Sequence, residues 1–361
     1  MVAMSGGVDS SVAALLLKES GYEVIGAHMR LWFREEDEQL YEENVKGCCS
    51  LAAAHDAQRV ADKIGIPYYV LNLRESFYRK VVTGFIGEYI QGRTPNPCIA
   101  CNRFIKWQEF LKKAEELDCD YIATGHYARI EYDDGRDRYL LYRGKDKSKD
   151  QTYMLSQITQ KQLSKTLFPL GGYNKESVRR IALEHKLGVG DKPDSQEICF
   201  VPEDDYGAFL QGEVPDKVQS GPIMTLDGER VGEHKGIAYY TIGQRRGLGV
   251  ALGRPMYVVD IDPQRNALII GEEDDLYARG LIAEDINFIP FETFEQPLDV
   301  SCKIRYNADD TLATLHPLQE KDCGKVLFET PQKAVTPGQG VTFYQGDLVV
   351  GGGTIKDKLE A

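Results

Sequence analysis

The sequence lacks any apolar run approaching the roughly 18 to 20 residues that a membrane span requires. Its N-terminus also lacks a basic region followed by an apolar core, the pattern that directs a chain to secretion. These absences argue against a membrane partner and favour a cytoplasmic protein. Because that compartment is reducing, the eight cysteines are not expected to form a structural disulfide framework, and some of them are available for chemistry or metal binding.

Positive charge is also scarce, because the formal net charge is −13. A surplus of acidic residues normally argues against a nucleic-acid partner, which is bound through Lys and Arg. Basic side chains nevertheless gather in two segments. Residues 79–113 carry seven basic side chains against two acidic ones, and residues 234–256 carry four and no acidic one. Such patches leave RNA binding open, although a charged run is more often a solvated face.

The loop at residues 4–10 reads Met-Ser-Gly-Gly-Val-Asp-Ser and lies between a short apolar run and an apolar, helix-like stretch. Gly6 and Gly7 let backbone N–H groups approach a phosphate closely, at the positive end of the following helix. Hydroxyl donors are added by Ser5, Ser10 and Ser11. A Walker A loop would continue with Gly-Lys-Ser/Thr, and that lysine is missing here. The pattern predicts a nucleotide-phosphate loop that serves the cleavage of a different bond; a tight Gly-Gly turn without a ligand is the alternative.

The first 200 residues alternate strand-length apolar runs with helical periodicity, which predicts an α/β fold of βαβ units around a parallel sheet. The expected strands are Val2–Met4, Glu23–Met29, Pro67–Leu71 and Tyr121–Thr124. The expected helices are Asp9–Ser20, Leu51–Ile64, Phe104–Leu117, Asp150–Leu163 and Lys175–Leu187. Because phosphates bind at the carboxyl ends of parallel strands, Thr124, Gly125 and His126 are expected at the same edge as the first loop.

The length of 361 residues exceeds a single typical core, so several domains are expected. We predict a nucleotide domain at 1–200 with a helical extension at about 145–200, a central small β domain at 201–274 and a C-terminal β-barrel domain at 275–361. The expected β-strands of the last two are Ile237–Thr241, Met256–Ile261, Ala267–Gly271, Val300–Ile304, Gly324–Phe328, Val341–Tyr344 and Leu348–Gly351. The sequence leaves open whether further residues precede Met1.

A second motif, at residues 92–107, contains the pair Cys98 and Cys101. Its prolines, Pro95 and Pro97, predict a stiff, non-helical loop, and Asn102 is expected to cap a helix that begins near Arg103. Cys101 would then lie at a helix N-terminus, where the dipole favours the thiolate. Four interpretations of these sulfurs remain: a redox pair, a zinc site, inert buried thiols, and active sulfur chemistry or an iron–sulfur cluster held by Cys98, Cys101 and Cys199.

The glycine loop resembles the PP-loop of the ATP pyrophosphatases, which cleave ATP between its α and β phosphates. The whole chain resembles the tRNA-specific 2-thiouridylases, a PP-loop family that installs sulfur at the 2-position of the wobble uridine of certain tRNAs. The motifs that carry this resemblance are Ser-Gly-Gly-Val-Asp-Ser-Ser (5–11), Gly-Arg-Thr-Pro-Asn-Pro (92–97), Cys101-Asn102, Ala-Thr-Gly-His-Tyr-Ala (123–128), Lys-Asp-Gln (149–151), Asp-Ser-Gln-Glu-Ile-Cys-Phe (194–200), Gly-Gln-Arg-Arg-Gly-Leu (243–248), Arg305-Tyr306 and Thr-Pro-Gly-Gln (336–339). The resemblance implies an adenine-nucleotide alpha-hydrolase-like sheet domain followed by two small β-barrel-like domains.

The resemblance also assigns roles to residues. Those matching the ATP site are Ala3, Met4, Ser5, Gly6, Gly7, Val8, Asp9 and Ser10, with Met29 and Gly125 on the adenine side. Asp9 matches the aspartate that handles Mg²⁺. The anticodon stem-loop of tRNA would be contacted by Asn96, Pro97 and Cys98 beside the target base and by His126, Lys149, Asp150, Gln151, Arg305, Tyr306 and Gln339. Cys101 matches the nucleophile, and Cys199 matches the cysteine that carries a persulfide.

The chain departs from many members of this family at Cys98, where they have an aspartate with an acid/base role. Two routes for sulfur are therefore open. In one, a donor protein supplies a persulfide to Cys199, and Cys101 closes a disulfide that releases the sulfur. In the other, Cys98, Cys101 and Cys199 hold a 4Fe-4S cluster whose fourth iron binds sulfide, and the presence of Cys98 favours this route.

Two other functions remain as alternatives. One is an ATP pyrophosphatase that forms amides or guanidino groups on small metabolites, and the other is an RNA-binding or sulfur-carrying module with a vestigial loop. The first has no use for three clustered cysteines, and release of pyrophosphate that depends on tRNA would discriminate among all three functions. The sequence assigns no role to Cys48 and Cys49, and it does not identify the tRNAs, the sulfur donor or the oligomeric state.

Overall fold

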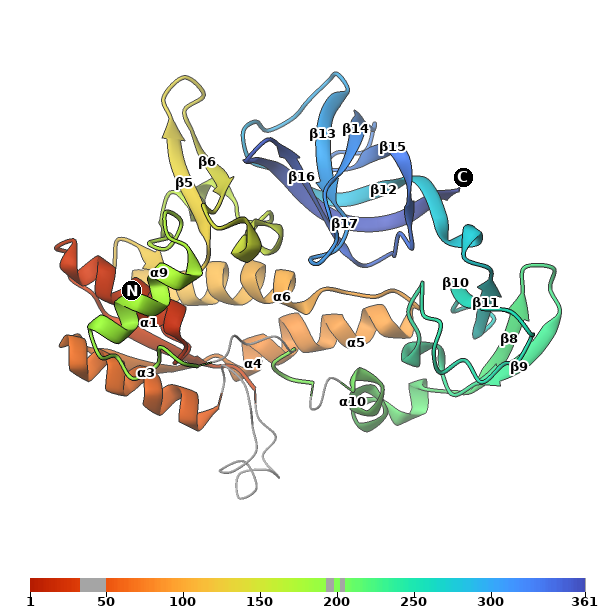
Figure 1. Cartoon of the computed structure of the whole chain (residues 1–361), viewed down its shortest axis with the longest axis horizontal. Helices are drawn as coiled ribbons and strands as arrows, with labels where there is room; N and C mark the ends of the chain where they lie inside the picture. The colour runs from red at the N-terminus through yellow and green to blue at the C-terminus, as the bar shows by residue number, and fades with distance from the viewer. Residues whose placement is uncertain (33–49, 193–197, 202–204, 361) are drawn as a thin grey trace.

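The computed structural model describes residues 1–32, 50–192, 198–201 and 205–360, and within them the chain forms an N-terminal α/β unit, a small central β unit and a C-terminal barrel (Figure 1). Cys48 and Cys49 lie outside the described residues, as do residues 194–197 of the motif that ends at Phe200. No helix in the described ranges is long and apolar enough to cross a bilayer.

A five-stranded parallel sheet forms the centre of the N-terminal unit, in the order β3-β2-β1-β4-β7. Its strands are β1 (Val2–Ala3), β2 (Gly26–Arg30), β3 (Tyr68–Asn72), β4 (Ile122–Ala123) and β7 (Thr166–Leu167). The predicted parallel sheet is confirmed, and its first four strands overlap the predicted ranges. The strand order reverses direction between β1 and β4, which is where ligands bind in open α/β sheets.

Helices cover both faces of this sheet. They are α1 (Val8–Glu19), α3 (Leu51–Ile64), α4 (Arg74–Phe77), η2 (Tyr78–Val82), α5 (Thr83–Ile90), α6 (Pro97–Ala100), η3 (Cys101–Phe110), α7 (Leu111–Glu116) and α9 (Lys175–Glu184). α1, α3 and α9 enclose one core, whereas Trp107 and Phe110 of η3 pack on the other face against Ala27 and Ile122. α3 begins and ends where the sequence predicts, because Ser50 caps its start and Gly65, at φ 67°, ends it.

The predicted helix over Asp150–Leu163 is wrong. The structure has the 3-10 turns η4 (Lys147–Lys149) and η5 (Thr152–Met154) and a short helix α8 (Gln160–Leu163) in and just before this range. Side chains of the segment bind the backbone of the barrel instead. Tyr153 Oη donates to the Gly340 carbonyl at 2.9 Å, and Gln157 Nε2 donates to the Gly352 carbonyl at 2.6 Å. These long-range bonds fix the segment in turns despite its helical periodicity.

The C-terminal unit is a closed barrel of six antiparallel strands in the order β12-β15-β14-β13-β16-β17, in which β12 also pairs with β17. The strands are β12 (Tyr277–Phe288), β13 (Leu298–Lys303), β14 (Thr311–Pro317), β15 (Gly324–Lys333), β16 (Gly340–Gln345) and β17 (Leu348–Glu360). Closure removes the exposed sheet edges of an open arrangement. The barrel surrounds a core that includes Leu281, Val326 and Phe343.

A hairpin that the sequence analysis missed joins the first unit to this barrel. It consists of β5 (Ala128–Asp133) and β6 (Arg138–Arg143), and Tyr142 of β6 pairs with Leu348 of β17. Leu141 of the hairpin also shares a core with Tyr344 and Val349 of the barrel. The barrel and the α/β unit are therefore held together through a continuous sheet and a common core.

The central unit has a four-stranded sheet in the order β10-β11-β8-β9. Its elements are α10 (Tyr206–Glu213), η7 (Pro215–Lys217), β8 (Gly221–Thr225), β9 (Arg230–His234), η8 (Ile237–Tyr239), β10 (Tyr257–Asp262), β11 (Ala267–Gly271) and η9 (Asp274–Leu276). The predicted strand over Ile237–Thr241 is wrong, since that segment forms η8. Gly236, at φ 147°, directs the chain into this turn, and the Tyr239 ring lies over Gly207 of α10.

Candidate active site

The loop between β1 and α1 is shaped to bind an anion. Gly6 has φ 74°, and a Cβ built on it would lie 2.2 Å from the Ala53 carbonyl oxygen, so only glycine fits there. Gly7 occupies the N-cap of α1. Because glycine has no side chain, it offers no side-chain acceptor to the first N–H groups of the helix. The exposed hydroxyl of Ser5 lies 3.2 Å from that of Ser10. The Ser10 hydroxyl accepts from the Ser5 nitrogen at 3.1 Å and donates to the Gly7 carbonyl at 3.3 Å, so it braces the loop. The donors left for an anion are the Ser5 hydroxyl and the N–H groups at the start of α1.

A second predicted hydroxyl donor, that of Ser11, also binds within the loop. Ser11 is fully buried, and its hydroxyl donates to the Gly7 carbonyl at 2.8 Å. Its role is therefore to brace the first turn of α1. The spacing of the serines could have predicted this, because a serine four residues after a carbonyl in a helix commonly donates back to it.

The neighbouring strand ends flank the loop. A Cβ on Gly125, just beyond β4, would lie 2.7 Å from the Ser10 nitrogen, so the chain passes directly against the phosphate loop. On the other side, half-buried Met29 lies near the end of β2. The residues that the resemblance assigns to ATP therefore lie together, with Ala3 to Ser10 in one turn and Met29 and Gly125 beside it.

Two lysines from distant segments contact this loop. Lys175 Nζ donates to both carboxylate oxygens of Asp9 at 2.7 and 2.8 Å, and Tyr127 Oη donates to the same carboxylate at 2.9 Å. Lys192 Nζ donates to the Gly6 carbonyl at 3.0 Å and also binds Asp56. Neither lysine is predictable from the sequence, because nothing in the local pattern around 175 or 192 indicates that α9 returns to the first loop.

The helix that carries the cysteines begins earlier than predicted. Pro97 occupies the first position of α6, and the Asn96 side chain caps it by accepting from the N–H groups of Cys98 and Ile99 at 3.1 and 3.3 Å. Proline is favoured at that first position, where its missing N–H needs no partner. The prediction that Asn102 caps the helix is wrong, since buried Asn102 instead donates to the Met154 carbonyl at 2.8 Å.

The earlier start of the helix places Cys98, and not Cys101, at the positive end of its dipole. Cys98, exposed on the first turn of α6, receives the positive end of the helix, whereas Cys101 lies one turn further along. Cys101 and Cys199 are half-buried, and both pack against one core cluster together with Met29. That cluster contains Leu31, which directly follows β2, the strand next to the one that leads into the phosphate loop.

Most of the side chains that the resemblance assigns to tRNA lie at two places. Tyr306 and Arg305 lie near Tyr153, which donates to the Gly340 carbonyl next to Gln339. Burial lowers the pKa of Arg305 and raises that of Tyr153, and Arg305 donates to the Ala334 carbonyl. With Asn96 they line the junction between α6 and the barrel.

In the segment 149–151, the side chains of Asp150 and Gln151 bind residues of the protein itself. Buried Asp150 accepts from the Thr152 hydroxyl at 2.8 Å and lies 3.9 Å from Arg143. Gln151 accepts from the Tyr127 nitrogen at 3.2 Å, so it ties this segment to the chain beside Asp9. Of the three residues in this segment, half-buried Lys149 carries the positive charge that would attract a phosphate.

His126 is enclosed and not at the surface. The residue is 8% exposed, and its ring packs against both Trp107 and Phe168. Thr124 Oγ1 lies 2.6 Å from one ring nitrogen and Lys106 Nζ lies 3.5 Å from the other. Burial, followed by the charge of Lys106, holds the pKa of His126 well below its usual 6.5. The Lys106 ammonium can only donate a hydrogen bond, so Nε2 of His126 is the acceptor. The proton of the neutral ring is then on Nδ1, which donates to Thr124.

We expect stability to fall in acid because of His126. Its pKa is lower in the folded than in the unfolded chain, so below about pH 6.5 the unfolded chain binds a proton that the folded protein excludes. The contribution of His126 to the free energy of unfolding has its full value above that pH. Below it, the free energy of unfolding decreases by at most about 1.4 kcal/mol per pH unit. Unfolding temperatures at about pH 7 and pH 5.5 should show a smaller acid loss in His126→Gln than in wild type. His185→Gln, at an exposed position, should behave as wild type; equal losses in all three would contradict the assignment.

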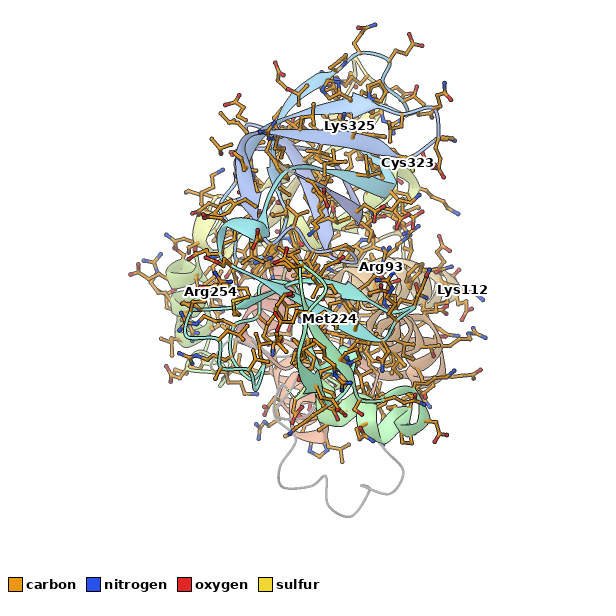
Figure 2. All side chains as sticks on the ribbon, turned by 90° about the vertical axis from the view of Figure 1, so that its right-hand side faces the viewer. Arg93, Lys112, Met224, Arg254, Cys323 and Lys325 are labelled. Carbon is orange, nitrogen blue, oxygen red and sulfur yellow. The ribbon has the colours of Figure 1, made fainter. Side chains whose placement is uncertain are left out.

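The motif at 92–97 contacts all three units. Arg93 pairs with Glu88 at 2.7 Å and with Glu284 of the barrel at 3.0 Å, and Figure 2 shows it below the barrel residues Cys323 and Lys325. The Thr94 nitrogen donates to the Pro337 carbonyl at 2.9 Å, and a Cβ on Gly92 would lie 2.6 Å from Ile261 of β10. The loop that leads to Cys98 is therefore positioned by both β units.

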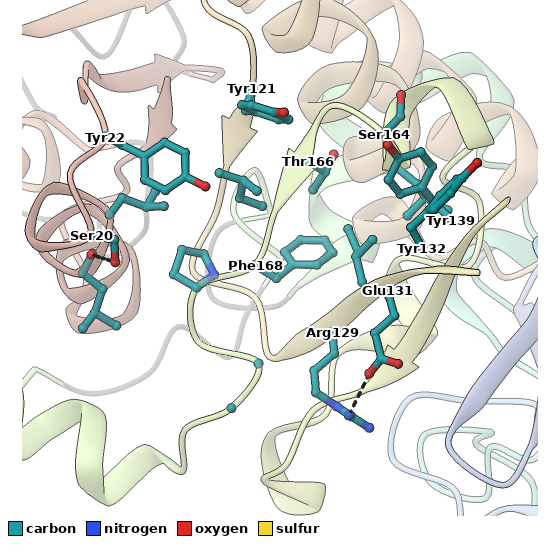
Figure 3. A pocket seen from close by; sticks show the side chains of 18 of the residues that line it. Ser20, Tyr22, Tyr121, Arg129, Glu131, Tyr132, Tyr139, Ser164, Thr166 and Phe168 are labelled. Atoms are coloured by element: carbon teal, nitrogen blue, oxygen red, sulfur yellow. Dashed lines mark hydrogen bonds and ion pairs between the residues drawn. The ribbon is translucent and has the colours of Figure 1, made fainter. Parts of the chain in front are cut away.

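A cavity of about 610 Å³ lies elsewhere on the α/β unit, between α1, the β7 region and the hairpin β5–β6 (Figure 3). Aromatic side chains such as Tyr121, Tyr139 and Phe168 line it, and Arg129 and Glu131 form an ion pair at its rim at 3.2 Å. Neither the phosphate loop nor any of the three cysteines lines this cavity, so it is separate from the candidate site.

Comparisons with known proteins cover nearly the whole chain. Residues 1–203 match the family model of the tRNA methyl transferase HUP domain, 207–272 that of the tRNA methyl transferase PRC-barrel domain, and 278–355 that of the aminomethyltransferase beta-barrel domain. The tRNA-specific 2-thiouridylase MnmA of Natranaerobius thermophilus is 69% identical over 98% of this chain and 96% of its own length. The protein of the same name from Clostridioides difficile is 52% identical over 99% and 98%.

Likeness to solved structures is weaker. An NMN synthetase from Francisella tularensis covers 58% of this chain and 76% of its own, at 15% identity and a TM-score of 0.33. A likeness at that level carries no argument about chemistry.

Proposed function

The chain belongs to the family of tRNA-specific 2-thiouridylases, and from this premise we propose that it replaces the 2-oxygen of the wobble uridine of tRNA by sulfur at the expense of ATP. The observation that carries the proposal is that Cys101 and Cys199 pack against one core. This core contains Leu31, which directly follows β2, the neighbour of the strand that leads into the phosphate loop. An activated base held at this edge of the sheet would have phosphate donors on one side and thiols on the other.

The chemistry requires activation because hydroxide is a very poor leaving group. The uracil 2-oxygen attacks the α-phosphorus of ATP, and the bond to the bridging oxygen breaks so that pyrophosphate leaves into the loop around Gly6 and Gly7. A sulfur nucleophile then attacks C2 of the base, and the C2–O bond breaks as AMP departs with the oxygen. The target base must be flipped out of its stack to reach this edge, which costs a few kcal/mol that contacts elsewhere on the tRNA offset.

Asp9 suits a magnesium ion bound with ATP. Mg²⁺ is commonly held by one or two carboxylates together with phosphate oxygens, and the Asp9 carboxylate lies on the first turn of α1 beside the anion site. When bound, the ion would supply positive charge to the leaving pyrophosphate. Asp9 would hold it, and the N–H groups of the loop would orient the phosphates.

In the sulfur step, a persulfide on Cys199 provides the nucleophile. Its outer sulfur attacks C2, and the thiolate of Cys101 then attacks the Cys199 sulfur, which breaks the sulfur–sulfur bond and leaves the outer sulfur on the base. The product is a disulfide between Cys101 and Cys199 that a cellular thiol must reduce. A donor protein supplies the persulfide sulfur.

The three thiols of Cys98, Cys101 and Cys199 also suit a 4Fe-4S cluster by their chemistry. Within the described residues, however, no three His, Cys, Asp or Glu side chains gather closely enough to hold a metal. The arrangement therefore does not fit a cluster as it stands. Anaerobic purification followed by iron and sulfide analysis separates the two routes: a colourless, fully active protein excludes the cluster, whereas iron that a Cys98→Ser variant fails to retain establishes it.

Release of pyrophosphate from ATP, measured with and without unmodified tRNA, tests the proposed function against its alternatives. We expect release that depends on tRNA, together with 2-thiouridine in the nucleosides of the recovered tRNA. Turnover without tRNA would favour a ligase acting on a small metabolite, and no turnover under either condition would favour a binding module.

A further inference from the structure

The phosphate loop contains no lysine, but two lysines from the C-terminal part of the α/β unit contact it. Lys175 is the first residue of α9, which packs on α1, and it contacts Asp9 at 2.7 and 2.8 Å. Lys192, in the segment beyond α9, contacts the Gly6 carbonyl at 3.0 Å. Both ammonium groups therefore lie against the turn that would hold the phosphates.

The position of Lys175 is not explained by the stability of its helix. A cation at the first position of a helix opposes the positive end of the dipole, and the favoured residues there are acidic. The chain nevertheless fixes Lys175 firmly, since Asn174 caps α9 by accepting from the Ser177 nitrogen at 2.8 Å, and Asp146 accepts from the Lys175 nitrogen at 3.0 Å. Its side chain is 12% exposed. A cation held rigidly at an unfavourable position indicates a use for its charge.

Lys192 is more open to solvent, with its side chain 36% exposed, but it is also held by a carboxylate. Its partner Asp56 is 12% exposed, and burial lowers the pKa of Lys192. Among the described residues, Asp9 pairs with Lys175 and Asp56 pairs with Lys192, at the place where a polyphosphate carrying several negative charges would arrive. The N–H groups of one helix end match a single phosphate group, so a triphosphate needs further positive charge.

We propose that Lys175 and Lys192 bind the β- and γ-phosphates of ATP, and the pyrophosphate formed from them, in place of the lysine that a Walker A loop carries. The inference rests on the proposed function, because it takes ATP as the ligand of the loop. On binding ATP, Lys175 exchanges the Asp9 carboxylate for phosphate oxygens, and Lys192 moves from Asp56 in the same way. The adenosine and α-phosphate end of the nucleotide does not touch either lysine.

The test compares three ligands on the full-length protein by calorimetric titration: ATP, pyrophosphate and AMP. Lys175→Met and Lys192→Met should each weaken ATP and pyrophosphate by about tenfold or more, while AMP binding changes by less than about twofold. Lys175→Arg, which keeps the charge, should retain most of the pyrophosphate affinity. Lys161→Met, at an exposed position on α8, is the matched control and should bind all three ligands as wild type does.

The outcomes separate this inference from the proposed function. Unchanged ATP and pyrophosphate affinities in both Met variants would overturn the lysine assignment alone, provided that the wild-type protein still releases pyrophosphate with tRNA. Loss of AMP binding equal to the loss of ATP binding would indicate a general disturbance of the site and would also overturn it. A wild-type protein that binds neither ATP nor pyrophosphate would remove the proposed function, and the assignment with it.

Discussion

Replacing Cys199 with serine should abolish sulfur transfer to tRNA while tRNA-dependent release of pyrophosphate continues. Serine is close to cysteine in size but cannot carry a persulfide, so thiolation should fall by at least about a thousandfold, the scale expected when a nucleophile is removed. The phosphate loop and Asp9 are untouched by the change, so adenylation should stay within about threefold of wild type. Mass analysis of tRNA nucleosides and a pyrophosphate assay on the same reaction measure the two steps separately.

Cys119→Ser provides the matched control for this experiment. Cys119 is likewise half-buried, but its thiol donates to the Leu117 carbonyl beyond the end of α7, away from the core that holds Cys101 and Cys199. Both activities should remain normal in that variant. If Cys199→Ser still produced 2-thiouridine at a rate near that of wild type, the persulfide step would have to be abandoned.

Substitution of Gly6 by alanine should damage both the fold and ATP binding. At φ 74° an alanine costs about 1 to 2 kcal/mol, and its Cβ would lie 2.2 Å from the backbone oxygen of Ala53, which cannot move without shifting α3. Together we expect a loss of about 2 to 4 kcal/mol, or roughly 5 to 15 °C in the unfolding temperature. Because the displaced turn carries the phosphate donors, ATP affinity should fall by at least about tenfold.

Gly7→Ala is the comparison that isolates this effect. Gly7 has φ −89°, and among the described residues a Cβ there would meet only the Ser5 hydroxyl, at 3.5 Å, which is an ordinary contact. The unfolding temperature of this variant should stay close to that of wild type by differential scanning calorimetry. Equal destabilisation of the two variants would show that the close approach of Gly6 to α3 does not control the shape of the loop.

The parts of the fold that depend on local pattern were predictable. The glycine loop, the parallel strands and the helix Leu51–Ile64 each carry their own signals in a few consecutive residues. The hairpin β5–β6 was also within reach, because Asp133, Asp134 and Gly135 form a turn signal between two apolar runs. It was missed because the strands were expected to alternate with helices throughout the first 200 residues.

Other features depend on contacts between distant residues and could not be predicted from local pattern. The segment around Tyr153 has helical periodicity, but its hydrogen bonds to Gly340 and Gly352 fix it in turns. Lys175 and Lys192 reach the phosphate loop only because α9 packs on α1. The misplaced start of the cysteine helix is different, since Pro97 was treated as a helix breaker although proline is favoured at a first helical position.

The pairing of β6 with β17 has a consequence for synthesis on the ribosome. Tyr142 and Leu141 are translated about 200 residues before their partners Leu348 and Val349 of β17. Translation proceeds at about 5 to 20 residues per second, so roughly 10 to 40 s pass between synthesis of the hairpin and synthesis of β17. During that time the hairpin exposes an apolar face and unpaired strand edges to other nascent chains. Chaperone demand should therefore be concentrated in that interval, and a chain cut after the first unit should aggregate more readily than the intact protein.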